Sequence, residues 1–146
     1  MEHLDAGELG RGGDIAPLRR CLDEAGYTEE AVCARLALAR LSDFEMEPAR
    51  RAPLPPPADA LDTLVHLFLC GDFVERGVLE RHLGAQTGAE LEALGLVRSG
   101  EPDQCYATVA LYPVNGFWYA SDRWSWPDGS PFEAPADTVY PALVHN

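Results

Sequence analysis

Between residues 14 and 44, apolar residues recur at helical spacing in two short segments. The first segment places four apolar residues on one helical face: Ile15, Leu18, Leu22 and Ala25. Gly26 is suited to end this helix, and Thr28 then caps a second helix that runs to about Leu41. We therefore predict a pair of helices in this part of the chain.

A stronger helical pattern follows a proline-rich stretch. Its apolar residues again share one face: Leu61, Leu64, Val65 and Phe68. Gly71 ends this helix, and a shorter helix ends at Gly84. Thr87 and Glu90 have the spacing of a capping box, which predicts a third helix that Gly95 ends.

After the third helix the pattern changes to strands. A short strand at 96–98 precedes a longer one at 104–112, and the dipeptide Asn115-Gly116 predicts a tight turn before a returning strand at 117–121. Three short helices followed by a β-hairpin are typical of a winged helix. We therefore expect an α+β fold, mainly α, with a winged-helix-like core.

These patterns divide the chain into five predicted segments. A flexible tail (1–13) precedes the helical pair (14–44), and a proline-rich linker (45–57) leads to the winged-helix-like domain (58–122). An extended strap (123–146), rich in aromatic residues and proline, follows. Consecutive prolines favour polyproline II, so we expect the linker to be semi-rigid.

The charge balance narrows the range of partners. The 146 residues include 24 acidic and 11 basic ones, which gives a formal net charge of −13. An acidic surface repels phosphate groups and anionic lipids, so we expect neither nucleic acid nor a membrane as a partner. The predicted third helix carries Glu90 and Glu92 and no positive charge, which also argues against DNA binding. No apolar leader or bilayer-length apolar run is present, so we expect a soluble, cytoplasmic protein.

The residues that most often carry chemistry form no site in this sequence. Four cysteines are widely spaced and lack the close pairs typical of zinc sites: Cys21, Cys33, Cys70 and Cys105. We expect them to be buried free thiols. His66 lies among apolar residues of a predicted helix, and we interpret it as a hydrogen-bonded histidine of the core or its edge. We nominate no catalytic, cofactor-binding or metal-binding residue.

Aromatic residues gather towards the end of the chain. We interpret Phe117 and Tyr119 as residues that pack the predicted hairpin onto the core. Trp124 and Trp126 lie on the proline-rich strap, beyond the last predicted strand. Together with Tyr140, they are our candidates for docking another domain, because large aromatic side chains dominate many interfaces.

Several of these segments resemble the N-terminal region of certain bacterial class I S-adenosylmethionine-dependent methyltransferases. These are the "methyltransferase small domain" proteins, related to the release-factor glutamine methyltransferases. The resemblance spans residues 18–146, and its apolar and aromatic patterns lie in seven segments: 61–68, 71–74, 79–83, 93–97, 118–124, 127–132 and 140–143. It implies a catalytic methyltransferase domain that follows Asn146 in the same polypeptide.

The active parts of that family have no counterpart in this chain. Its glycine-rich cofactor loop follows a strand, whereas the glycine cluster at 10–13 follows no predicted strand, and its Asn-Pro-Pro-Tyr motif is absent. S-adenosylmethionine is therefore expected only for the full-length protein. We predict a non-catalytic N-terminal accessory domain that packs on the catalytic domain and helps to position its substrate. The alternative is a free-standing acidic adaptor that binds a basic protein.

Overall fold

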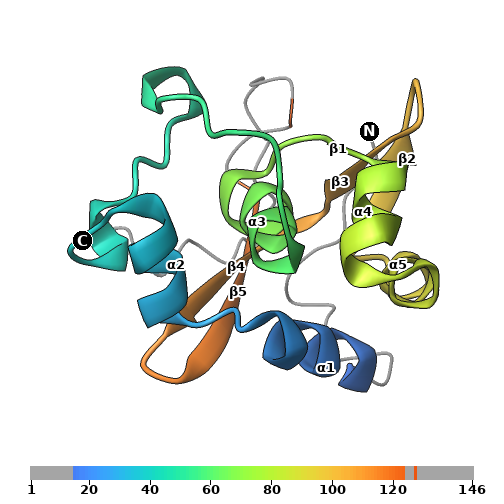
Figure 1. Ribbon diagram of the computed structural model, residues 1–146, viewed down its shortest axis with the longest axis horizontal. Helices are drawn as coiled ribbons and strands as arrows, with labels where there is room; N and C mark the ends of the chain where they lie inside the picture. Colours follow the sequence, from blue (N-terminus) through green and yellow to red (C-terminus); the bar gives the residue numbers. More distant parts are fainter. Residues whose placement is uncertain (1–14, 124–126, 128–146) are drawn as a thin grey trace.

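The computed structural model describes residues 15–123 and Pro127. In this part of the chain, five α-helices and a π-helix pack around two small antiparallel sheets (Figure 1). The α+β class predicted from the sequence is confirmed. None of the helices in this part has the length and apolarity that crossing a bilayer requires.

The two predicted N-terminal helices are present. Helix α1 spans Ala16–Ala25 and ends at Gly26, whose φ of 70° lies in the left-handed region that glycine tolerates. Helix α2 spans Glu29–Leu36, and the Thr28 hydroxyl accepts a hydrogen bond from the first turn, as predicted. The chain adopts a left-handed conformation at Ala37, so α2 ends earlier than the sequence pattern indicated.

The proline-rich stretch crosses the surface with two short 3₁₀ turns near it, η2 (Leu41–Asp43) and η3 (Pro48–Arg50). Arg51 attaches this stretch to the rest of the fold. Its guanidinium group donates to the Cys70 carbonyl oxygen at 3.0 Å and lies 5.0 Å from the centre of the Phe44 ring.

The central helix has two parts. Helix α3 (Ala60–Leu64) is capped by the Asp59 carboxylate and continues as a π-helix, η4 (Val65–Cys70). It ends at Gly71, as predicted, with a φ of 73°. The Arg123 side chain occupies the space above this glycine, because a Cβ atom there would lie only 1.5 Å from Nη2 of Arg123.

Helices α4 (Arg76–Leu83) and α5 (Ala85–Ala93) follow one another with only Gly84 between them. The predicted capping box of Thr87 and Glu90 is wrong, because α5 begins before Thr87 and has no side-chain cap. Gly84 has a φ of 92° and turns the chain sharply enough to serve as the end of one helix and the start of the next.

A three-stranded antiparallel sheet joins distant parts of the chain. It contains β1 (Val74–Glu75), β2 (Val97–Gly100) and β3 (Gln104–Ala107) in the order β1-β3-β2. Strand β1 lies between the central helix and α4, where Val74 pairs with Cys105. It was not predicted, because two residues are too few to show an alternating pattern.

The second sheet is a hairpin of β4 (Val109–Val114) and β5 (Phe117–Asp122). The single strand predicted at 104–112 is therefore wrong: it is divided at Thr108 into β3 and β4, which belong to different sheets. The hydroxyl group of Thr108 is fully buried and donates to the Gly95 carbonyl oxygen at 2.7 Å. This bond stabilises the polar residue where the chain passes from one sheet to the other.

The buried apolar side chains form one continuous core. Residues from α1 and α2 belong to it together with residues from the central helix, α5 and both sheets. Among the largest completely enclosed side chains are Tyr27, Phe68, Leu91 and Tyr112. The N-terminal helices are thus packed on the same core as the segment predicted to resemble a winged helix.

Candidate functional site

The aromatic residues nominated from the sequence fall into two groups. Trp124, Trp126 and Tyr140 lie outside the described residues. Phe117 and Tyr119 are described, and the prediction that they pack the hairpin onto the core is wrong. Their side chains are 65% and 45% exposed to solvent.

The alternation of β5 explains this difference. Successive side chains of a strand point to opposite faces, so Phe117 and Tyr119 share one face while Trp118 points to the other. The indole of Trp118 donates to the carbonyl oxygen of Tyr27 at 2.7 Å. Trp118 therefore attaches the hairpin to the body, and its two aromatic neighbours face outward.

The tip of the hairpin has the turn that the sequence predicted. Asn115 and Gly116 have φ values of 52° and 78°, as a type I′ turn requires. Val114 pairs with Phe117 directly after this turn. The two-residue connection fixes the register, so Phe117 is held at the tip and its ring contacts the ring of Tyr119 edge-on, at 6.3 Å between centroids.

Tyr27 connects both strands of the hairpin to the turn between α1 and α2. Its hydroxyl donates to the Leu111 carbonyl oxygen of β4 at 2.7 Å, and its own carbonyl accepts the bond from Trp118 of β5. The side chain is completely buried, and burial raises the pKa of the Tyr27 hydroxyl well above its ordinary value. The phenol therefore remains a proton donor at physiological pH.

A cavity of about 200 Å³ lies between this hairpin and the start of α2. We call it the hairpin groove, and nine residues line it: Asp23, Tyr27, Thr28, Glu29, Glu30, Pro113, Gly116, Phe117 and Trp118. The lining combines three carboxylates with aromatic rings and contains no basic side chain. In Figure 1 the hairpin projects beside α2, away from the three-stranded sheet.

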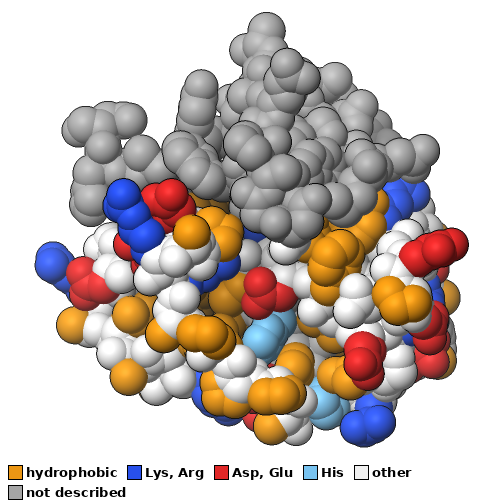
Figure 2. Space-filling model, turned by 90° about the horizontal axis from the view of Figure 1, so that it is seen from above, with side chains coloured by type: hydrophobic (Ala, Val, Ile, Leu, Met, Phe, Trp, Pro, Cys, Tyr) orange, Lys and Arg blue, Asp and Glu red, His pale blue; other side chains and the backbone are white. Residues whose placement is uncertain are grey.

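His66 borders a smaller cavity of about 100 Å³. On the face shown in Figure 2, histidine side chains lie beside acidic and apolar ones. The Nδ1 of His66 lies 3.1 Å from the Asp72 carboxylate, and its Nε2 lies 2.9 Å from the Pro55 carbonyl oxygen. Both partners are acceptors, so the arrangement favours the doubly protonated ring, and the bond to Asp72 raises the pKa of His66. The interpretation of His66 as a hydrogen-bonded histidine is confirmed.

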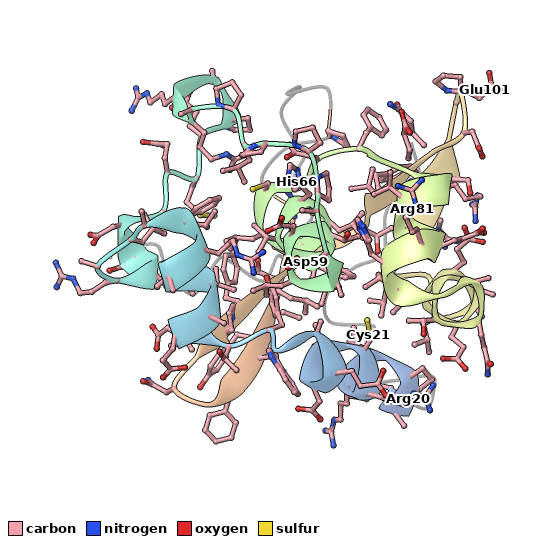
Figure 3. The ribbon with its side chains drawn as sticks, viewed as in Figure 1. Arg20, Cys21, Asp59, His66, Arg81 and Glu101 are labelled. Atoms are coloured by element: carbon pink, nitrogen blue, oxygen red, sulfur yellow. The ribbon has the colours of Figure 1, made fainter. Side chains whose placement is uncertain are left out.

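The four cysteines are free and buried, as predicted. Burial raises the pKa of Cys21, which points from α1 towards the interior (Figure 3), to about 11, and that of Cys70 to about 12. Such thiols carry almost no thiolate at neutral pH and are weak nucleophiles. Among the described residues, no group of three or more His, Cys, Asp or Glu side chains is placed to hold a metal ion.

Arg123 is the last residue of the continuous described segment, directly after β5. Its side chain is buried, and its Nη1 has no hydrogen-bond partner among the residues that the structure describes. Desolvation lowers the pKa of this guanidinium group, and the nearby positive charge of Arg51 contributes to the shift. A buried cation with an unpaired donor lowers the stability of a fold.

The carboxylates of α5 are engaged within the fold. Glu90 forms an ion pair of 2.8 Å with Arg20 of α1, and Glu92 pairs with Arg76 at the start of α4. The helix that would face DNA in a winged helix is thus acidic, and its acidic side chains contact neighbouring elements of the same chain.

A family model described as a domain of unknown function, DUF7059, matches residues 24–108, more than half of the chain. The match ends at Thr108, where the chain leaves the three-stranded sheet, and the hairpin of β4 and β5 follows it. No curated protein and no solved structure matches the chain.

Proposed function

The chain belongs to the DUF7059 family, and we propose that it serves as a non-catalytic, N-terminal accessory domain of an S-adenosylmethionine-dependent methyltransferase. In this role it packs on a catalytic domain of the same polypeptide and helps to position the substrate. The observation that carries the proposal is the outward-facing aromatic pair, Phe117 and Tyr119, on a hairpin that Tyr27 and Trp118 hold in place.

This aromatic pair has the properties of a docking surface. Exposed aromatic side chains are unfavourable in an isolated domain, and they are enriched at interfaces, where they bury a large area with little loss of conformational freedom. The two hydrogen bonds of Tyr27 attach the hairpin to the core, so a partner would meet a surface that is already formed. The resemblance noted in the sequence supplies the identity of that partner.

We further assign the segment from α3 to β3 to the winged-helix class. Its order of central helix, β1, α4, α5, β2 and β3, with strands arranged β1-β3-β2, supports this assignment. The ion pairs that connect α5 to α1 and α4 favour a packing module over a DNA reader, because a DNA reader presents basic and amide side chains on this helix.

The hairpin groove, in contrast, favours the second candidate function, an acidic adaptor for a basic protein, because its carboxylates could bind such a partner without any catalytic domain.

The two functions are separated by comparing the chain with the protein that its gene encodes in full. We expect a glycine-rich loop after a strand downstream of residue 146, micromolar S-adenosylmethionine binding by the full-length protein, and none by residues 1–146 alone. Calorimetry measures both. A full-length protein that binds no S-adenosylmethionine would remove the methyltransferase proposal.

The docking role is tested by adding the downstream domain, expressed separately, to residues 1–146. The double variant Phe117→Ala/Tyr119→Ala should weaken this association by about tenfold or more, since aromatic residues are frequent hot spots. Phe73→Ala is not a suitable control, because its ring packs against Tyr106. Glu101→Gln, at the opposite end of the molecule from the hairpin in Figure 3, should leave the association unchanged.

A further inference from the structure

We propose that the hairpin groove binds the guanidinium group of an arginine side chain, presented by a basic peptide segment of a partner protein. The inference rests on the second candidate function, an acidic adaptor for a basic protein, and it uses the Phe117 ring that the proposed docking of a catalytic domain also uses. Three properties of the groove carry it: three carboxylates without an ion-pair partner among the described residues, the exposed ring of Phe117, and a size that suits one side chain.

The groove contains three carboxylates that form no ion pair among the described residues. Asp23, Glu29 and Glu30 line it, and none of them has an ion-pair partner in the part of the chain that the structure describes. Elsewhere an acidic helix residue such as Glu90 is paired with an arginine, Arg20. The α2 dipole offsets only about half a unit charge, so the groove remains attractive to a cation.

The aromatic wall favours arginine over lysine. The Phe117 ring is exposed and stands edge-on to Tyr119, and Trp118 is held by its bond to Tyr27. A planar guanidinium group can stack on such a ring while its N–H groups donate to the carboxylates of the groove. An ammonium group offers a point charge and no planar face, so it gains less from this arrangement.

The size of the groove indicates what kind of ligand enters. Sites for small organic molecules usually measure roughly 300–1,000 Å³. The groove measures about 200 Å³, which suits a single long side chain better than a compact metabolite. The net charge of −13 would also draw a basic segment towards the chain and speed its association.

Calorimetry with the full 146-residue chain tests the proposal. The probe is a short Arg-Gly repeat peptide, compared with the same peptide carrying citrulline, a neutral residue of the same shape, at each arginine position. We expect the citrulline peptide to bind at least about tenfold more weakly, and a peptide with lysine at each arginine position to have an affinity between the two. Binding of the arginine peptide should weaken as salt is raised, because exposed charges are screened.

Variants locate the binding. Glu29→Gln and Glu30→Gln should each weaken binding of the arginine peptide by about 2–5-fold, the range for exposed ion pairs. Phe117→Ala should weaken it by a similar factor through loss of the cation–π contact. The double variant Glu24→Gln/Glu101→Gln removes two acidic charges outside the groove and is the matched control, which should change affinity by less than twofold.

Each remaining outcome overturns the proposal. Equal binding of the arginine and citrulline peptides would show that charge is not recognised. Equal losses in the groove variants and in the control pair would show only general attraction to an acidic surface. If Phe117→Ala weakened binding and the glutamate variants did not, the groove would be an apolar docking site instead. Amide shifts by nuclear magnetic resonance, with the indole signal of Trp118 as reporter, confirm that each variant is folded.

Discussion

The hydroxyl group of Tyr27 provides the sharpest test of how the hairpin is held. Tyr27→Phe removes a single oxygen and keeps the ring, so it leaves the packing of the core largely unchanged. The hydrogen bond that is lost measures 2.7 Å, is completely buried and joins residues 84 positions apart in sequence. Because the Leu111 carbonyl oxygen would lose a buried donor, we expect the free energy of unfolding to fall by about 1–2 kcal/mol.

Urea unfolding followed by circular dichroism measures this change. The slope of the unfolding free energy against urea concentration should stay constant, since the variant exposes no additional surface on unfolding. A loss of about 1–2 kcal/mol also corresponds to a fall in Tm of about 4–8 °C for a domain of this size. Tyr119→Phe is the matched control: its side chain is 45% exposed, and a surface change of this kind usually stays within about 0.5 kcal/mol.

A double-mutant cycle with Trp118→Phe extends the test. Tyr27 is bonded to β4 through its hydroxyl and to β5 through its carbonyl, which accepts from Trp118. The losses of unfolding free energy in the two single variants should therefore not be additive. We expect a coupling energy of at least about 0.5 kcal/mol. The reasoning is refuted if Tyr27→Phe has no larger effect than Tyr119→Phe, because the hairpin would then be held by packing alone.

Two further predictions concern the core and its edge. The pKa of His66 is raised by Asp72, so the stability from this pair is present below the ordinary histidine pKa and is lost as pH rises through the raised value. The free energy of unfolding, measured from about pH 5 to 9, should therefore fall more steeply in the native chain than in His66→Gln; parallel curves would contradict this. Gly88→Ala should lower the free energy of unfolding by about 1–2 kcal/mol, because a Cβ atom would lie 2.8 Å from Cδ2 of the buried Leu79. Gly77→Ala, whose Cβ atom would have no neighbour within 4 Å, should raise it by about 0.5–1 kcal/mol in the same urea assay.

Features set by local chemistry could be predicted from the sequence. Thr28 caps α2 because its hydroxyl reaches a free amide within the same turn, and Gly26 and Gly71 end helices because they tolerate a positive φ. The Asn115-Gly116 turn is specified in the same way, by two residues that adopt the left-handed region readily. Each of these signals lies within a few residues of the feature that it determines.

Features set by distant contacts could not be predicted. The chain leaves one sheet at Thr108 because its hydroxyl meets the carbonyl oxygen of Gly95, which no periodicity shows. The hydrogen bond between Trp118 and Tyr27 turns one face of β5 towards the core. Phe117 lies on the opposite face and therefore points outward. The apolar character of these residues is visible in the sequence, but the face on which each lies is not.

The candidate site was missed for the same reason. Glu29 and Glu30 lie in the first turn of α2, where carboxylates interact favourably with the helix dipole, and this local role alone accounts for them in the sequence. Their position beside Phe117 arises only when the hairpin folds against this helix, almost ninety residues later in the chain. The acidic charge excess was the available signal, and it indicated a basic partner without indicating where that partner would bind.

Strand β5 departs most clearly from what stability alone would select. Its first and third side chains, Phe117 and Tyr119, are aromatic and exposed, whereas the residues of the paired strand β4 are buried along almost its whole length. Arg123, directly after β5, is buried with an unpaired donor. Exposed rings and an unsatisfied cation both weaken an isolated domain, and such departures gather at functional positions. A partner that covers the outward face of β5 would bury the rings of Phe117 and Tyr119 and so compensate for their exposure.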